Sequence, residues 1–262
     1  MATLVLFHAH PDDEAIGTGG TMAKAAAGGH RVVLVTATRG EQGEYPEGFL
    51  AEGQALGDVR ADELAAAASI LGAARTELLG YRDSGMIGTP ENDAPESFWQ
   101  ADIDDAAAKL AGLLREEAAD VLVVYDDNGV YGHPDHIQVH RVGVRAAELA
   151  GVERVFESTV NRTAWRRRMT ELAVAEGAEA QATPTIDFPI GVEEAELSHA
   201  IDVSEFIDVK RKAMRAHASQ ITDESWFMKM REEDFAAGFG TEWFRLRGAP
   251  GGTRHADLFA DS

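Results

Sequence analysis

Apolar residues in the first part of the chain form short continuous runs, and alanine-rich stretches with helical spacing lie between them. The runs Leu4–Phe7 and Val32–Val35 lie within predicted strands at residues 3–9 and 30–38, and residues 13–27 form the helical stretch that joins them. Continuous apolar runs are typical of strands that are buried on both faces of a parallel sheet. A strand, a helix and a second strand with short joints predict a βαβ unit with a right-handed crossover.

The same alternation continues to about residue 160. It predicts helices at residues 59–71, 102–119 and 134–150, and strands at residues 77–80, 120–125 and 152–160. Residues 40–57 are rich in Gly, Glu and Pro, which indicates a loop.

Beyond residue 160 the pattern weakens. Helices are expected at residues 162–177 and 203–219, a loop with a possible edge strand at 178–189, and mostly coil from Gly238. The fold class that follows is α/β, a single Rossmann-like domain with a mostly parallel sheet flanked by helices. We expect residues 1–160 to form the α/β core and residues 161–262 to form a C-terminal embellishment that shapes the substrate cleft.

The charge of the chain limits its partners. Its 262 residues include 45 acidic and 24 basic ones, and the resulting net charge of −21 repels nucleic-acid backbones and anionic membranes. No apolar run approaches the roughly 20 residues of a membrane span, and the start of the chain lacks the pattern of a signal peptide. We therefore expect a cytoplasmic protein with no nucleic-acid partner and no membrane partner.

The chain contains no cysteine. Disulfides, thiolate nucleophiles and sulfur ligands for metals are excluded for that reason. Any bound metal must be held by imidazole and carboxylate groups, a set of ligands that suits zinc or ferrous iron.

Histidine and aspartate residues cluster behind two predicted strands. His10 and Asp13 come after the first strand, and His136 comes after the strand at 120–125. In open α/β sheets, sites form outside the carboxyl ends of the strands. We predict that His10, Asp13 and His136 hold one metal ion and leave a fourth position for water. Taken singly, each cluster is equally consistent with helix-capping aspartates and surface histidines.

Other residues in these clusters have the chemistry that amide hydrolysis requires. Asp12 is suited to accept a proton from water, although it would also serve as a helix N-cap. His133, as an imidazolium, is suited to stabilise an oxyanion, and Asp135 to orient either His133 or His136. Tyr131 offers a hydroxyl donor, and its alternative role is to pack the loop.

Both clusters resemble a known family. The motifs His10–Glu14 and His133–His136 look like those of the PIG-L/LmbE-like family of zinc-dependent N-acetylglucosaminide deacetylases. The segments Thr38–Glu41, Arg82–Met86 and Tyr131–His133 are most similar to its mycothiol-pathway members. The resemblance covers roughly residues 3–150 and is thin afterwards.

The resemblance implies roles for individual residues. It places the zinc ligands on His10, Asp13 and His136 and the general base on Asp12. It places His133 and Tyr131 at the reaction centre. Arg60 and Asp83 match residues that hold sugar and inositol hydroxyls, although an arginine on a helix face and an Asp-containing turn are also common without such a role.

The expected activity is removal of an N-acetyl group from an N-acetylglucosamine-type conjugate, a small-molecule amino-sugar substrate. Zinc is the expected cofactor, and ferrous iron is the alternative in the cell. Two other functions stay open: an amidase that cleaves a larger sugar–thiol conjugate of the mycothiol type, and a non-catalytic sugar-binding protein. A homo-oligomer is compatible with the sequence. His217 either approaches the site from the C-terminal part or belongs to a helix end.

Overall fold

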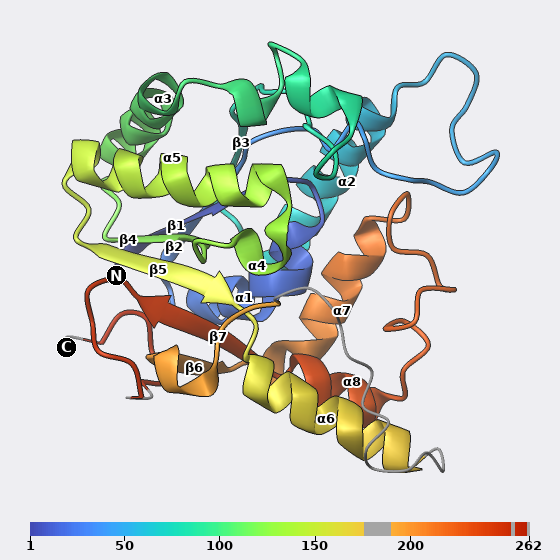
Figure 1. Cartoon of the computed structure of the whole chain (residues 1–262). Coiled ribbons are helices and arrows are strands. Elements are labelled where there is room, and N and C mark those ends of the chain that lie inside the picture. Colours follow the sequence, from blue (N-terminus) through green and yellow to red (C-terminus); the bar gives the residue numbers. More distant parts are fainter. Residues whose placement is uncertain (176–189, 253–254, 261–262) are drawn as a thin grey trace.

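The computed structural model describes residues 1–175, 190–252 and 255–260, and its strands form one sheet in the order β3-β2-β1-β4-β5-β7-β6 (Figure 1). The strands are β1 (Thr3–His8), β2 (Arg31–Thr36), β3 (Arg75–Leu78), β4 (Val121–Tyr125), β5 (Arg154–Thr159), β6 (His199–Asp202) and β7 (Thr241–Leu246). The first five strands are parallel, whereas β7 is antiparallel to both β5 and β6. The expected α/β fold with a mostly parallel sheet is confirmed.

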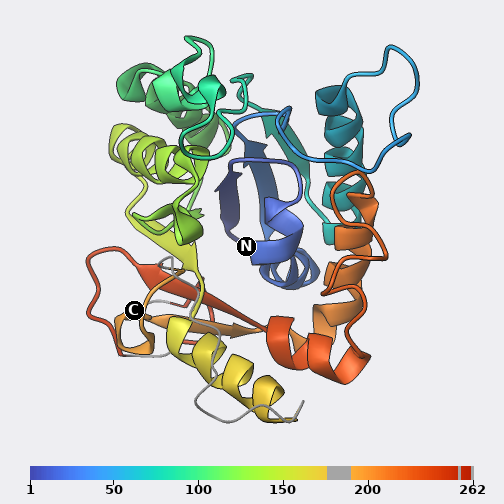
Figure 2. The same cartoon turned by 45° about the vertical axis from the view of Figure 1, so that its right-hand side comes forward.

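Helices cover both faces of the sheet. They are α1 (Gly19–Ala27), α2 (Leu56–Leu71), α3 (Ile103–Glu116), α4 (Gly129–Gly132), α5 (Pro134–Ala150), α6 (Arg162–Ala175), α7 (Ile207–Ala216) and α8 (Glu232–Phe239), and one turn of π-helix, Glu14–Thr18, precedes α1. Helices α3 and α5 lie on one face, and α1, α2 and α7 lie on the other (Figure 2). None of the helices in the described part of the chain is long and apolar enough to cross a membrane.

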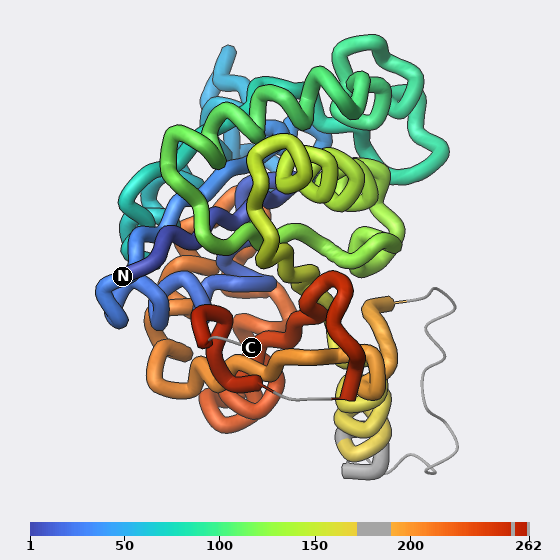
Figure 3. Tube along the Cα trace, turned by 90° about the vertical axis from the view of Figure 1, so that its left-hand side faces the viewer, coloured from blue at the N-terminus to red at the C-terminus, as the bar shows by residue number. Residues whose placement is uncertain are grey.

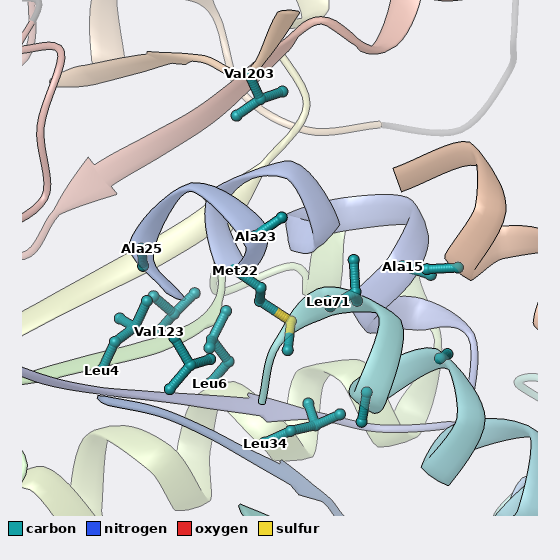
Figure 4. Packing of buried hydrophobic residues seen from close by; sticks show 14 of the residues in the cluster. Leu4, Leu6, Ala15, Met22, Ala23, Ala25, Leu34, Leu71, Val123 and Val203 are labelled. Carbon is teal, nitrogen blue, oxygen red and sulfur yellow. The ribbon is translucent and has the colours of Figure 1, made fainter. Parts of the chain in front are cut away.

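Strand β1 shows why the sheet needs helices on both sides. Leu4 and Leu6 pack into the core beneath α1, α2 and α7, which includes Met22 and Leu71 (Figure 4). Val5 and Phe7, which alternate with them, pack into the second core beneath α3 and α5. Successive side chains of a strand point to opposite faces, so a continuous apolar run is what two covered faces require.

The order of the strands positions the site. β1 pairs with β2 on one side and with β4 on the other, for example through Leu6↔Leu34 and Leu6↔Val123. The crossover direction therefore reverses between β1 and β4, and a crevice opens outside their carboxyl ends at such a switch point. Both polar clusters of the sequence follow these two strands.

The C-terminal part differs from expectation. The expectation of mostly coil from Gly238 misses β7, which extends the main sheet, and strand β6 and helix α8 were not predicted either. The apolar pattern of β7 is interrupted because Glu242 occupies one of its buried positions, where it pairs with Lys210. The expected edge strand at 178–189 lies outside the described residues. Figure 3 shows the C-terminal part, in orange and red, packed along the N-terminal half.

Candidate metal centre and active site

The two polar clusters meet at the switch point. β1 ends at His8 and leads through His10 into the π-helical turn, while β4 ends at Tyr125 and leads through α4 into α5. Pro134 occupies the first turn of α5, where its missing N–H costs no hydrogen bond, and the helix brings His136 inward. The ring centroids of His10 and His136 are 5.3 Å apart.

Buried imidazole and carboxylate groups converge there. His10, His133 and His136 are buried and offer nitrogen atoms that lie within 4.8 Å of one another. The Oδ2 atom of Asp13 is 3.4 Å from Nδ1 of His10 and 3.4 Å from Nε2 of His136. The predicted trio His10, Asp13 and His136 is therefore brought together, with His133 beside it.

These groups fit a zinc-type cation. Imidazole nitrogens and carboxylate oxygens are the ligands that zinc takes when cysteine is absent. The nitrogen of His136 that faces Asp13 is Nε2, at 3.4 Å from Oδ2, so this is the donor atom that a cation beside Asp13 would take. Burial alone would raise the pKa of Asp13, but the facing His136 and the hydrogen bonds from His10 and His136 hold that pKa well below its usual range. Asp13 is therefore ionised, as a metal ligand must be.

Asp12 has a different environment from its neighbour. Burial raises the pKa of Asp12 to about 7, with Arg60 opposing the shift and Asp13 adding to it. Oδ2 of Asp12 lies 3.2 Å from Nη2 of Arg60, and the side chain faces the cavity. A carboxyl group whose pKa lies near the working pH is suited to general acid–base catalysis.

His133 corrects one expectation. Its Nδ1 accepts a hydrogen bond from the backbone N–H of Asp135 at 3.1 Å. Burial, followed by the nearby His10 and His136, lowers the pKa of His133 to about 3. Because Nδ1 accepts this hydrogen bond, the ring carries its proton on Nε2, and both the contact and the lowered pKa favour a neutral ring over the expected imidazolium. A neutral Nε2–H is still a donor for an oxyanion.

Asp135 corrects a second expectation. It is expected to orient His133 or His136, and its backbone N–H does contact His133, but its carboxylate contacts a third ring: Oδ2 lies 3.1 Å from Nε2 of His10. The same oxygen accepts the backbone N–H of Ser84 at 2.9 Å, and its other oxygen accepts the Ser84 hydroxyl. Asp135 and Ser84 thus fix the ring of His10, a role in which a carboxylate orients a ligand. Ser84 was not singled out from the sequence because a serine in a Gly-containing loop has no distinctive pattern.

Tyr131 stands at the mouth of the site. Its hydroxyl lies 3.3 Å from Nε2 of His136, and 36% of the residue is exposed. Burial of the hydroxyl, with Asp13 nearby, raises its pKa, so the phenol stays protonated. The turn that carries it is held by Asp126, which accepts the backbone N–H of Val130 at 2.9 Å. Val130 itself has a φ of 65°, which is rare for a β-branched residue.

Arg60 and Asp83 line a cavity of about 490 Å³ in front of the candidate ligands. Arg60 is buried, and it donates to the carbonyl oxygens of Gly40 and Pro11 as well as facing Asp12. Asp83 accepts the backbone N–H groups of Gln42 and Gly85 at 3.1 and 2.8 Å. Both residues stabilise loops around the site, and their contact with substrate stays a prediction.

The C-terminal part reaches the site from behind the cavity. Nε2 of His217 lies 2.6 Å from Oε1 of Glu14, and both residues are fully buried. Against the effect of burial, Glu14 raises the pKa of His217 and His217 lowers the pKa of Glu14. Among the described residues, those that line the cavity all precede residue 134, so the expected role of residues 161–262 in shaping the cleft stays a prediction.

Known protein sequences resemble this chain. A family model described as PIG-L, GlcNAc-PI de-N-acetylase, matches residues 5–147. A 1D-myo-inositol 2-acetamido-2-deoxy-alpha-D-glucopyranoside deacetylase of Salinispora arenicola is 46% identical over 92% of this chain and 81% of its own length. The protein of the same name from Acidothermus cellulolyticus is 44% identical over 99% of this chain and 95% of its own length.

Solved structures share the fold. The N,N'-diacetylchitobiose deacetylase of Pyrococcus horikoshii superposes with a TM-score of 0.61 at 21% identity, over 95% of this chain and 84% of that one. The 4-carboxy-2-hydroxymuconate hydratase GalB of Pseudomonas putida superposes with a TM-score of 0.57 at 18% identity, over 98% and 100% of the two chains. One fold thus carries a deacetylase and a hydratase, so the reaction must be argued from the site.

Proposed function

The chain belongs to the PIG-L family, and from this premise we propose that it is a metal-dependent N-deacetylase of a glucosaminide. The proposed substrate is 1D-myo-inositol 2-acetamido-2-deoxy-α-D-glucopyranoside, on which the relatives that share 46% and 44% of aligned residues are named to act. The observation that carries the proposal is the convergence of His10, Asp13 and His136 beside the cavity.

We propose His10, Asp13 and His136 as the residues that hold zinc. When bound there, zinc supplies a Lewis acid for the amide carbonyl and lowers the pKa of water. The ionised Asp13 and the two buried imidazoles supply the donor atoms, and Asp135 keeps the ring of His10 in place.

The remaining chemistry belongs to side chains of the chain itself. In the proposed mechanism, Asp12 accepts a proton from the attacking water and returns it to the leaving amine, so that acetate and a free amino sugar are formed. His133 donates Nε2–H to the oxygen of the tetrahedral intermediate, and Tyr131 offers a second donor. A neutral His133 keeps this role without a change in protonation.

The cavity supports a neutral sugar as substrate. Its volume of about 490 Å³ lies in the range of small-molecule sites. Its charged lining residues are Asp12, Asp13, Glu44, Asp83, Glu91 and Arg60. Five carboxylates and one guanidinium disfavour an anionic ligand, whereas hydroxyl groups can donate to carboxylates.

Acetate release from the inositol glucosaminide tests the proposal. The zinc-loaded enzyme should release one acetate for each amine formed, and a bulky amide of the same amino sugar should be cleaved more slowly. A purified, zinc-loaded protein that leaves the glucosaminide intact would refute the deacetylase assignment, and faster cleavage of the bulky amide would favour an amidase.

A further inference from the structure

The backbone of Asp12 is held in an unusual conformation. Its φ is 116°, in a region that residues other than glycine rarely adopt. Such a conformation is strained and persists only where the surroundings fix it. The contacts that fix Asp12 are therefore contacts that place its carboxylate.

Glu14 supplies one of these contacts. Its Oε2 accepts the backbone N–H of Asp12 at 3.0 Å. The carbonyl of Asp12 in turn accepts the N–H groups of Ala15 and Ile16 at 3.1 Å each, as the first turn after it requires. The side chain of Glu14 thus fixes the backbone of Asp12. Arg60 separately contacts the Asp12 carboxylate.

Glu14 can hold Asp12 only if its own buried charge is balanced. Glu14 is fully buried and follows two other acidic residues, and a buried carboxylate without a partner is strongly destabilised. Within the part of the chain that the structure describes, its cationic partner is His217, at 2.6 Å from Oε1. One carboxylate therefore joins His217 to the backbone of Asp12.

His217 comes from the opposite end of the sequence and is itself firmly placed. It follows the last residue of α7, and α7 packs against α1 and α2. Two residues later, Ser219 donates its N–H and its hydroxyl to Glu63 of α2, at 2.7 and 2.6 Å. The segment is thus clamped to α2 independently of the contact between His217 and Glu14.

We propose that His217 acts through Glu14 as a positioning residue that sets the placement of the Asp12 carboxylate. The inference rests on the proposed role of Asp12 in deacetylation. Without His217, Oε1 of the Glu14 carboxylate is left without its partner, the side chain turns away, and the N–H of Asp12 loses its acceptor. Asp12 then samples other orientations, while the residues that would hold the metal remain in place.

Four variants test this: His217→Ala, His217→Gln, Ser219→Ala, and His217→Ala combined with Asp12→Ala. His217→Ala should lower kcat about 10- to 100-fold, with KM and zinc content unchanged. This loss is typical when a residue that orients a functional side chain is removed. His217→Gln should recover most of kcat, because its amide nitrogen can still donate to Glu14. Ser219→Ala loosens the same segment without touching Glu14, and should lower the Tm while keeping kcat.

The double variant separates positioning from general destabilisation. If His217 acts through Asp12, the double variant should be no slower than Asp12→Ala alone, because residues that act as a unit are not additive. A further loss on top of Asp12→Ala would overturn the proposal, as would an unchanged kcat in His217→Ala or a loss of zinc in that variant.

A second readout does not depend on activity. In the metal-free protein, amide hydrogen exchange followed by NMR should show the Asp12 N–H less protected in His217→Ala than in the wild type and in Ser219→Ala. Equal protection in all three would overturn the proposal. An inactive wild-type enzyme would refute the deacetylase function but would leave this comparison valid, so the two failures can be told apart.

Discussion

Three adjacent acidic residues have three different environments. Burial raises the pKa of Asp12 to about 7, His136 and His10 hold the pKa of Asp13 well below its usual range, and His217 lowers that of Glu14, in the last two cases against the effect of burial. Neighbouring carboxyl groups with divergent pKa values are typical of sites that separate a proton carrier from permanently ionised groups. The sequence Asp-Asp-Glu alone does not distinguish the three roles.

At the residue scale, His133 is the decisive case, since it lies close enough to His10 and His136 to be a ligand itself. We predict that His133→Ala retains zinc like the wild type and lowers kcat by about 10²–10³, the loss expected when one oxyanion donor is removed. Zinc content by mass spectrometry and kcat for acetate release are the measurements. A variant that has lost its zinc would make His133 a ligand rather than an oxyanion donor.

At the scale of elements, the predictions from sequence succeeded where the apolar period was undisturbed. The helix expected at residues 134–150 agrees with α5, which begins at a proline and ends before Gly151 in the left-handed conformation. Strand β7 was missed because a charged residue occupies one of its core positions. Glu242 accepts the N–H groups of Gly20 and Thr21 at the start of α1, at 2.8 Å each, and no local pattern reveals a partner 222 residues away.

This buried pair gives a prediction about stability. Lys210 Nζ lies 2.6 Å from Glu242 Oε1, and 2% of each side chain is exposed. Removing one partner of a buried pair costs about 3–5 kcal/mol, whereas apolar replacement of both is often close to neutral. Glu242→Leu should therefore lower the free energy of unfolding more than Glu242→Leu combined with Lys210→Met, as measured by urea unfolding.

The lost bonds to the start of α1 are common to both variants and cancel in that comparison. Equal losses in the single and the double variant would show that the capping of α1, and not the ion pair, is what Glu242 contributes.

At the scale of the whole molecule, the sequence predicts where the site lies but not which residues hold the site side chains in place. The runs before His10 and before His133 predict neighbouring parallel strands, and parallel strands deliver their carboxyl ends to one edge. Ser84 was missed because it acts through Asp135, which only the folded chain brings near. Glu14 was missed and the contact of His217 was left open for the same reason, since these two residues act through each other.

A surface cluster at the amino ends of β2 and β3 predicts a pH dependence: Arg31 and Arg75 begin these strands, and both contact Glu117. Hydrogen bonds from Arg31 and Arg75 lower the pKa of Glu117 from 4.5 to about 2. A lowered pKa stabilises the fold above the unfolded value and loses that stabilisation as the pH falls toward the folded value. Glu117→Gln should therefore lower the free energy of unfolding by about 1 kcal/mol at pH 7, given screening by solvent.

The difference between Glu117→Gln and the wild type should shrink as the pH falls from 4.5 toward 2. Urea unfolding of both proteins at a series of pH values measures it. A difference that stays constant down to pH 2–3 would mean that the charge of Glu117 contributes nothing.

The number of zinc ions retained per chain tests the central claim most directly. Wild-type protein and His136→Ala are loaded with zinc, desalted and measured by elemental mass spectrometry, with circular dichroism to verify that both are folded. We predict about one zinc per chain in the wild type and far less in the folded variant, because a catalytic site has only three protein ligands. Equal zinc in both proteins, or acetate release by a wild type that retains none, would contradict the account.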